Sequence, residues 1–284
     1  MKFDSNFKEI KIRQILIMFL IALLISIPIT LVLSINGEIS NTNVNKLSLL
    51  IEFLFLSIIT FKLKPSKENM KLLYVDFKNN LNIKEIIWIV LFVTCLEIGT
   101  SNILIDIAYI IGPNFANWFI NNSSVVINSI TDYWMIFAMT VFFTPFIDEI
   151  MFRNILFKRI SKKSNIYVGL IVSSIIFASL NFGNEMIGLF LLGIVNCMLY
   201  VKYENILMPM LIDCADSIIH MLKFVLFGKY GNEVVVLTFK DMILYATSGL
   251  TLCIIGIIFF VKFIKDNKIY LRKSFNESKN ANIN

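Results

Sequence analysis

Residues 133–157 read YWMIFAMTVFFTPFIDEIMFRNILF, an apolar run that also carries the charged residues Asp148, Glu149 and Arg153. A helix needs about 20 mostly apolar residues to cross the hydrocarbon core of a bilayer. The run therefore predicts a transmembrane helix. Its charged side chains contribute nothing to solubility there, and ionisable groups inside a membrane are costly, which makes them candidates for function.

Apolar runs of similar length occur along the whole chain. Hydrophobic residues make up 57% of the sequence and charged residues 16%, whereas soluble proteins average roughly half and a quarter. The expected fold class is therefore all-α, a polytopic transmembrane helical bundle with about eight spans. The other expected spans are residues 12–34, 47–61, 86–111, 166–182, 186–201, 205–222 and 242–261.

The distribution of Lys and Arg predicts the orientation of this bundle. With the N-terminus in the cytoplasm, every basic residue lies in a cytoplasmic segment except Arg153, which is inside a span, and the external Lys46, Lys223, Lys229 and Lys240. Cytoplasmic loops of membrane proteins are enriched in Lys and Arg. Both termini are therefore expected in the cytoplasm (N-in/C-in), with the bilayer and no nucleic acid as partner. The Ile-, Asn- and Lys-rich composition favours a bacterial plasma membrane as the cell membrane involved.

The chain divides into three expected parts. Residues 1–132 hold the first three spans, residues 133–222 the core, and residues 223–284 the last span with a basic cytoplasmic tail. Residues 112–130 are expected as an external loop or an interfacial helix, and the tail from Lys262 as disordered. The cysteines have no metal-ligand spacing and are expected as packing residues without disulfides. They are Cys95, Cys197, Cys214 and Cys253.

Two further spans carry polar residues in an apolar setting. Asn181 lies at the end of the fifth expected span. In the seventh, Asp213, Asp216, Ser217 and His220 follow the spacing i, i+3, i+4, i+7, which places them on one helix face. His220 is the one histidine of the sequence. Together with the charges of the fourth span, these residues predict a polar site inside the bundle.

Simpler interpretations of these residues stay open. Glu149 and Arg153 have the favourable i, i+4 order, which fits a neutralised pair that fixes helix packing as well as it fits a site. Asn181 fits a helix cap, and a lone histidine such as His220 is often a packing residue. Other intramembrane acids lack an evident motif, namely Glu52, Glu97 and Asp106.

In order and spacing, these segments resemble the CPBP family of intramembrane proteases, which includes the type II CAAX prenyl endopeptidases and the Abi-type bacteriocin-immunity proteins. The family shows a Glu pair followed by Arg, then Phe with His four residues later, then a His followed three or four residues later by Asn. The intervening Phe190-Leu-Leu-Gly193 and Leu207-Met-Pro209 also match. The resemblance covers residues 133–222 and implies a membrane-embedded peptide or protein substrate.

The chain departs from the family pattern at its reactive positions. Asp148 stands in place of the first Glu, and Asn181 and Asp213 stand in place of the two motif histidines. The family's Asn position falls on Asp216 or Ser217. The resemblance thus implies catalytic positions at Asp148, Glu149, Asn181 and Asp213, with Arg153, Asp216, Ser217 and His220 as supporting residues.

The family's chemistry transfers to these residues only in part. In the family the first acid activates a water, and the His and Asn side chains bind a metal or donate to the oxyanion. Asp148 can act as a general base, and Asn181 can donate its amide hydrogen to an oxyanion. An ionised Asp213 cannot donate. The cofactor is open, since a divalent metal between Asp148 and Asp213 is compatible with the sequence, whereas one histidine excludes a His-rich zinc site.

Three functions follow as hypotheses. The leading one is a CAAX-protease-like membrane protein with altered or lost peptidase activity that binds membrane-associated peptides, in bacteriocin self-immunity or peptide signalling. The alternative is an active intramembrane endopeptidase that uses Asp148 and Glu149, so the sequence leaves open whether the protein is an enzyme. The third is a small ion-coupled transporter, which would be expected to show internal repeats that are not found in this sequence.

Overall fold

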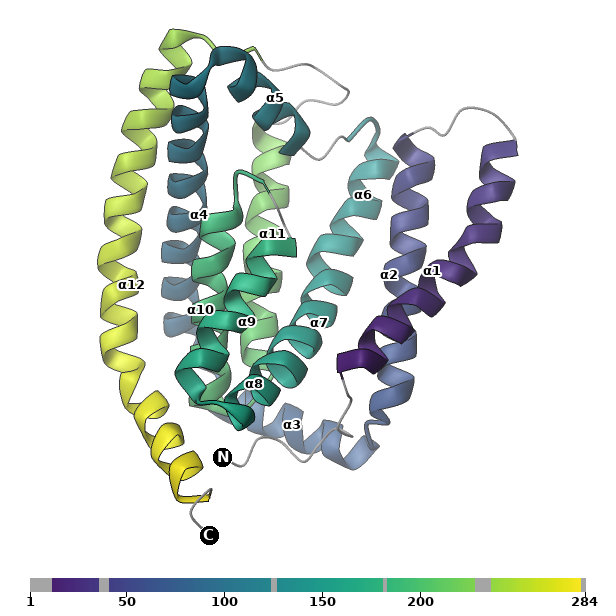
Figure 1. The fold of residues 1–284 in the computed structure, drawn as a ribbon, viewed down its shortest axis with the longest axis vertical. Helices are drawn as coiled ribbons and strands as arrows, with labels where there is room; N and C mark the ends of the chain where they lie inside the picture. Colours follow the sequence, from purple (N-terminus) through teal and green to yellow (C-terminus); the bar gives the residue numbers. More distant parts are fainter. Residues whose placement is uncertain (1–11, 36–40, 124–126, 181–182, 228–235, 282–284) are drawn as a thin grey trace.

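The chain folds as a bundle of long helices, with no β-strand in any part that the structure describes (Figure 1). The structure is a computed structural model that describes residues 12–35, 41–123, 127–180, 183–227 and 236–281. Helices suit this composition because each satisfies its backbone hydrogen bonds internally, as an apolar surrounding requires. The expected all-α class is confirmed.

Successive passes of the chain run in alternating directions through the bundle (Figure 1). At one edge, α1 (Ile12–Ile35) and α2 (Asn41–Leu63) form an antiparallel pair. At the other edge, α4 (Ile83–Ile111) packs along α12 (Phe239–Ala281). The helices between them are α6 (Ile130–Ala138), α7 (Thr144–Asp148), α8 (Lys158–Lys163), α9 (Ile166–Leu180), α10 (Met186–Tyr203) and α11 (Leu207–Phe227).

Length and hydropathy identify this bundle as a multi-pass membrane protein. In the described part of the chain, five helices are long and apolar enough to cross a membrane. Two shorter apolar helices, Ile17–Pro28 and Ile166–Leu180, stand beside them. Each of the eight expected spans coincides with a helix, and α1 begins on the side where α12 ends (Figure 1). The five candidate spans are Val44–Leu63, Ile83–Ile111, Ile130–Lys163, Met186–Tyr203 and Phe239–Phe275.

The fourth pass is one continuous column in which α-helix alternates with π-helix. The π-helical segments are Met139–Phe143 and Glu149–Phe157, on either side of α7. Pro145 explains the π-helical segment Met139–Phe143, because proline has no amide hydrogen to donate to the carbonyl oxygen four residues earlier. The Thr144 N–H instead donates to Met139 O, five residues back. Short π segments inside helices often accompany functional sites, and Asp148 lies where the second one begins.

Two short helices lie across the ends of the bundle. α5 (Pro113–Ser123) covers the end at which α4 finishes (Figure 1), within the segment expected as an external loop or interfacial helix. α3 (Lys67–Asn80) lies at the opposite end, in a segment that the sequence analysis treated only as a cytoplasmic connection. Ser66 caps α3 by accepting a hydrogen bond from the Asn69 N–H, a common start of a helix.

The expectation of a disordered tail from Lys262 is wrong for most of that segment. α12 continues as a helix through Ala281. Phe263 and Leu271 are 7% and 6% exposed, and the ring of Phe275 lies 5.7 Å from that of Tyr167 on the fifth pass. The hydropathy of the sequence falls after residue 261, where the chain leaves its apolar surrounding. Packing against the bundle stabilises the helix beyond that point.

Candidate functional site

An ion pair on the fourth pass lies in the interior of the bundle. Arg153 Nη1 lies 2.7 Å from Glu149 Oε1, and the side chains are 1% and 0% exposed. The Arg153 guanidinium also lies over the Phe177 ring of α9, with Cζ 4.6 Å from the ring centroid. The expected i, i+4 pair is therefore formed. Removal of one buried partner leaves the other charge uncompensated, at a cost of about 3–5 kcal/mol.

Asn196 of α10 connects this pair to α11. Its Nδ2 donates to Glu149 Oε1 at 3.2 Å and to Asp213 Oδ1. Glu149 and Asp213 therefore share one donor, and their charges act on each other. Asn196 is 0% exposed and Asp213 is 7% exposed. We call Glu149, Arg153, Asn196 and Asp213 the inner network.

Asp148 lies beside the inner network without joining it. Its side chain is half-buried and forms no hydrogen bond with a described residue. The charges that act on it are those of Asp213, Arg153 and Glu52. Glu52 of α2 is itself held by Thr144, whose hydroxyl donates to Glu52 Oε2 at 3.2 Å. Asp148 thus lies between the second pass and the inner network.

Asn181 lies outside the described residues, so its expected catalytic role as a donor to an oxyanion stays a prediction. Phe177, four residues earlier in the same motif, packs on Arg153 and on Phe152, whose ring centroid is 5.1 Å away. Ser217 is half-buried. Of the family positions that the structure describes, Glu149 and Arg153 are in direct contact, and Asn196 connects Glu149 to Asp213.

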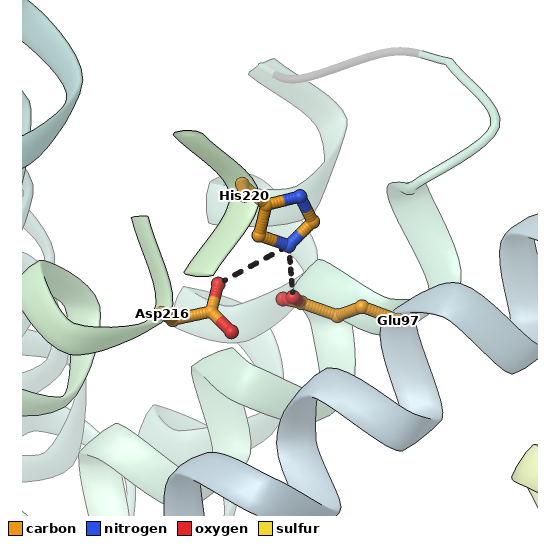
Figure 2. A group of neighbouring side chains, drawn as sticks. All are labelled: Glu97, Asp216 and His220. Carbon is orange, nitrogen blue, oxygen red and sulfur yellow. Dashed lines mark hydrogen bonds and ion pairs between the residues drawn. The ribbon is translucent and has the colours of Figure 1, made fainter. Parts of the chain in front are cut away.

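A second polar cluster lies farther along α11. His220 Nε2 lies 3.1 Å from Glu97 Oε2 of α4 and 3.5 Å from Asp216 Oδ2 (Figure 2). Glu97 is 2% exposed and Asp216 is 6% exposed, whereas the His220 side chain is 29% exposed. The three side chains converge from two helices, with one imidazole nitrogen directed at both carboxyl groups (Figure 2). We call Glu97, Asp216 and His220 the outer triad.

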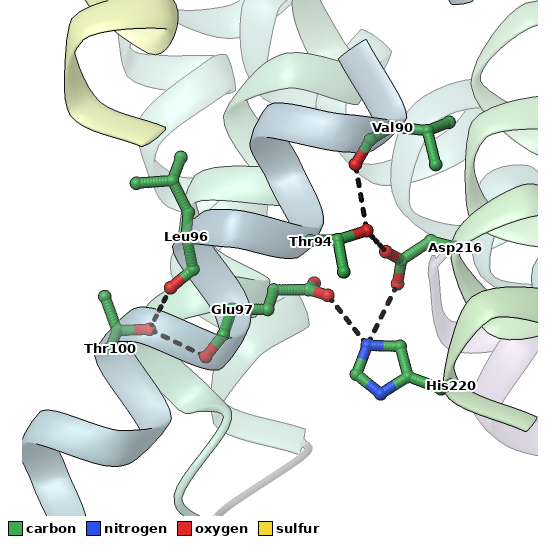
Figure 3. Close-up of polar contacts among 7 residues, drawn as sticks. All are labelled: Val90, Thr94, Leu96, Glu97, Thr100, Asp216 and His220. Atoms are coloured by element: carbon green, nitrogen blue, oxygen red, sulfur yellow. Dashed lines mark hydrogen bonds and ion pairs between the residues drawn. The ribbon is translucent and has the colours of Figure 1, made fainter. Parts of the chain in front are cut away.

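Thr94 supports the outer triad from one turn earlier on α4. Its Oγ1 lies 3.0 Å from Asp216 Oδ1 and 2.9 Å from the Val90 carbonyl oxygen (Figure 3). The hydroxyl therefore fixes the carboxyl oxygen that faces away from His220. Such a contact holds Asp216 in one orientation.

Close helix packing places Glu97 at this point. A Cβ added at Gly188 of α10 would lie 2.6 Å from Glu97 Cα, so only glycine permits this approach of α10 to α4. Asn184, just before α10, donates from Nδ2 to Ser101 Oγ of α4 at 2.8 Å. The start of α10 therefore confines the Glu97 side chain and turns it toward α11.

The predicted polar face of α11 is divided between the two clusters. Asp213 belongs to the inner network, whereas Asp216 and His220 belong to the outer triad. Sequence reasoning left out Glu97 and Asn196 as site residues. The signal for Glu97 is an acid inside an apolar span, although no motif surrounds it. The signal for Asn196 is an amide inside an apolar span, since polar as well as charged residues inside a membrane are candidates for function.

The donor set at the family positions does not fit a bound metal ion. Asp213 is already engaged by Asn196, and the positive charge of Arg153 acts on both Glu149 and Asp213. Among the His, Cys, Asp and Glu side chains of the described residues, one group of three brings its ligand atoms within 4.8 Å of one another, and that group is the outer triad. The expectation of a divalent metal between Asp148 and Asp213 therefore gains no support.

A cavity of about 530 Å³ opens elsewhere, between the start of α4, the end of α10 and residues 259–270 of α12. No member of either cluster lines it. Lys202, in its wall, pairs with Glu85 at 2.5 Å. The cavity also contains Trp88 and Lys262, a combination of aromatic and basic side chains typical of a membrane–water interface.

The fold and the inner network define a multi-pass membrane protein with a polar, CAAX-protease-like core. Residues 130–218 match the model of the family described as type II CAAX prenyl endopeptidase Rce1-like. The expected resemblance to the CPBP family is thereby confirmed for this segment. No curated protein matches the chain. No solved structure matches it either.

Proposed function

We propose that the protein binds membrane-embedded peptide or protein segments and has lost the peptidase activity of its family. The observation that carries this proposal is the state of Asp213, at the position of a family histidine. Asp213 accepts a hydrogen bond from Asn196, which also donates to Glu149, so its carboxyl group is held in the inner network. A carboxyl oxygen that accepts a hydrogen bond within such a network cannot also donate a hydrogen bond to a developing oxyanion.

The rest of the inner network supports the same conclusion. Glu149 pairs with Arg153 and accepts from Asn196, an arrangement that holds three passes together. Buried polar networks of this kind make a helix arrangement specific. The family scaffold is thus kept while two of its reactive positions, Glu149 and Asp213, serve packing, which suits a protein that receives a peptide without hydrolysing it. Bacteriocin self-immunity and the regulation of a signalling peptide, in a bacterial plasma membrane, are the roles we propose.

The test compares Asp148→Asn with wild type in a strain that lacks the protein, at matched abundance in the membrane. Full function of Asp148→Asn is expected, because a binding protein does not need a general base. Asp106→Asn on α4 is the matched control, since Asp106 is another buried acid that touches neither cluster. Loss of function in Asp148→Asn alone, with normal abundance, would refute the proposal.

One observation favours a second candidate, an active endopeptidase. Asp148 is half-buried and makes no hydrogen bond with a described residue, so one carboxylate at the family's first acid position is free to activate water. Purified protein in lipid bilayers would then cleave membrane peptides, and Asp148→Asn would abolish the cleavage. Uncut peptides with wild type, across a broad panel, would leave only the binding function.

A further inference from the structure

The outer triad has the composition and spacing of a metal site. Ligand atoms bound to a tetrahedral zinc ion at 2.0–2.1 Å lie about 3.3–3.4 Å from one another. In the structure, His220 Nε2 is 3.1 Å from Glu97 Oε2 and 3.5 Å from Asp216 Oδ2. These two separations bracket the tetrahedral value, and the third, between the Glu97 and Asp216 oxygens, is at most 4.8 Å. The side chains thus need little rearrangement to share one ion.

Glu97 gives a second and independent indication of a ligand. Its side chain is 2% exposed, and Oε1 is buried without a hydrogen-bond partner among the described residues. The carboxyl group is directed at His220 and Asp216 (Figure 2). A buried carboxyl oxygen without a partner is costly, and coordination to a cation would satisfy it.

Charge balance points the same way. Without a metal the triad is neutral only if one carboxyl group keeps its proton, whereas two carboxylates, a neutral imidazole and a divalent ion sum to zero with both acids ionised. Uncompensated charge in an apolar surrounding is unfavourable. The contact from Thr94 Oγ1 to Asp216 Oδ1 resembles the supporting hydrogen bonds that orient metal ligands.

The outer triad is accessible from one side, because the His220 side chain is 29% exposed. Glu185, an exposed acid just before α10, acts electrostatically on His220. A negative charge near the entrance raises the local concentration of cations.

From this geometry we propose that Glu97, Asp216 and His220 bind a divalent transition-metal ion of the zinc class, with one coordination position left for water or a ligand. The imidazole selects zinc-like ions over magnesium and calcium, which prefer oxygen ligands. The site shares only Asp216 with the family positions, because Glu97 on α4 and His220 both lie outside the matched residues 130–218. It is also independent of the proposed peptide binding, since it does not involve the inner network.

The experiment measures metal content in the full chain, purified in lipid nanodiscs, stripped with a chelator and dialysed against zinc chloride. Wild type and the control Asp106→Asn are expected to retain one zinc ion per chain in the presence of excess magnesium. Glu97→Gln and His220→Gln are expected to bind zinc at least about a hundredfold more weakly, and Thr94→Val about tenfold more weakly. Zinc retention by His220→Gln equal to that of wild type would overturn the proposal.

A second measurement does not depend on variants. Cobalt(II) added to stripped wild type is expected to give the intense visible absorption of a four-coordinate ion, and zinc is expected to abolish it. If stripped wild type shows no such bands and no zinc-dependent rise in Tm, the triad is an ion pair of protonated His220 with two acids, and the metal proposal is wrong.

Discussion

Replacement of Asn196 by alanine tests whether the inner network is as closed as its geometry indicates. Asn196→Ala removes the donor to both Glu149 and Asp213 and leaves two buried acceptors without it. A hydrogen bond to a charged group contributes about 1.5–3 kcal/mol in soluble proteins, whereas side-chain hydrogen bonds inside membranes average about 0.6 kcal/mol. Because Asn196 is 0% exposed and no solvent replaces it, we expect a loss of about 2–4 kcal/mol.

The assay is the free energy of unfolding of the full chain in lipid bicelles, measured for a double-mutant cycle. Asn196→Ala and Asp213→Ala remove the two ends of one contact, so the double variant is expected to lose less than the sum of the single losses. The coupling energy should lie near about 1–3 kcal/mol. The control cycle pairs Asn196→Ala with Asp106→Ala, which share no contact and should be additive within about 0.5 kcal/mol. Additivity in the Asn196 and Asp213 cycle would refute the network.

Three further outcomes are expected. Gly99→Ala should lower the free energy of unfolding by about 1–3 kcal/mol, because its Cβ would lie 2.7 Å from a backbone nitrogen of α12, while Gly112→Ala, whose Cβ meets nothing within 4 Å, should change it by less than about 0.5 kcal/mol. Phe177→Leu should cost about 1–2 kcal/mol by removing the ring under Arg153. Amide hydrogen exchange should show protection across residues 263–275, and exchange there as fast as in an unfolded peptide would contradict the helical tail.

Hydropathy predicted the passes because it measures what the bilayer imposes, and the helices coincide with all eight expected stretches. It could not predict where a helix ends once the chain has left that surrounding. α12 therefore extends past Lys262, and α3 forms where only a connection was expected. Both depend on packing and capping, which a window of average hydropathy does not register.

The candidate site was predictable where its residues share one helix. The Glu149–Arg153 pair follows from a spacing of four residues. The outer triad does not, because Glu97 is far from His220 in sequence and meets it only since Gly188 lets α10 approach α4. The role of Asn196 could not be predicted either, because it depends on the two acids, Glu149 and Asp213, that lie on other helices and accept its hydrogen bonds.

The π-helical segments of the fourth pass have a consequence for insertions and deletions. A π turn holds one residue more than an α turn, so the helix on either side keeps the faces it would have without that residue. Loss of one residue from Met139–Phe143 can therefore be absorbed by a return to regular α-helix. Loss of one residue from a regular α-helical part of a pass instead turns every later side chain by about 100° about the helix axis. The stretch just before Asp148 is thus where the length of this pass can vary while its polar residues keep their direction.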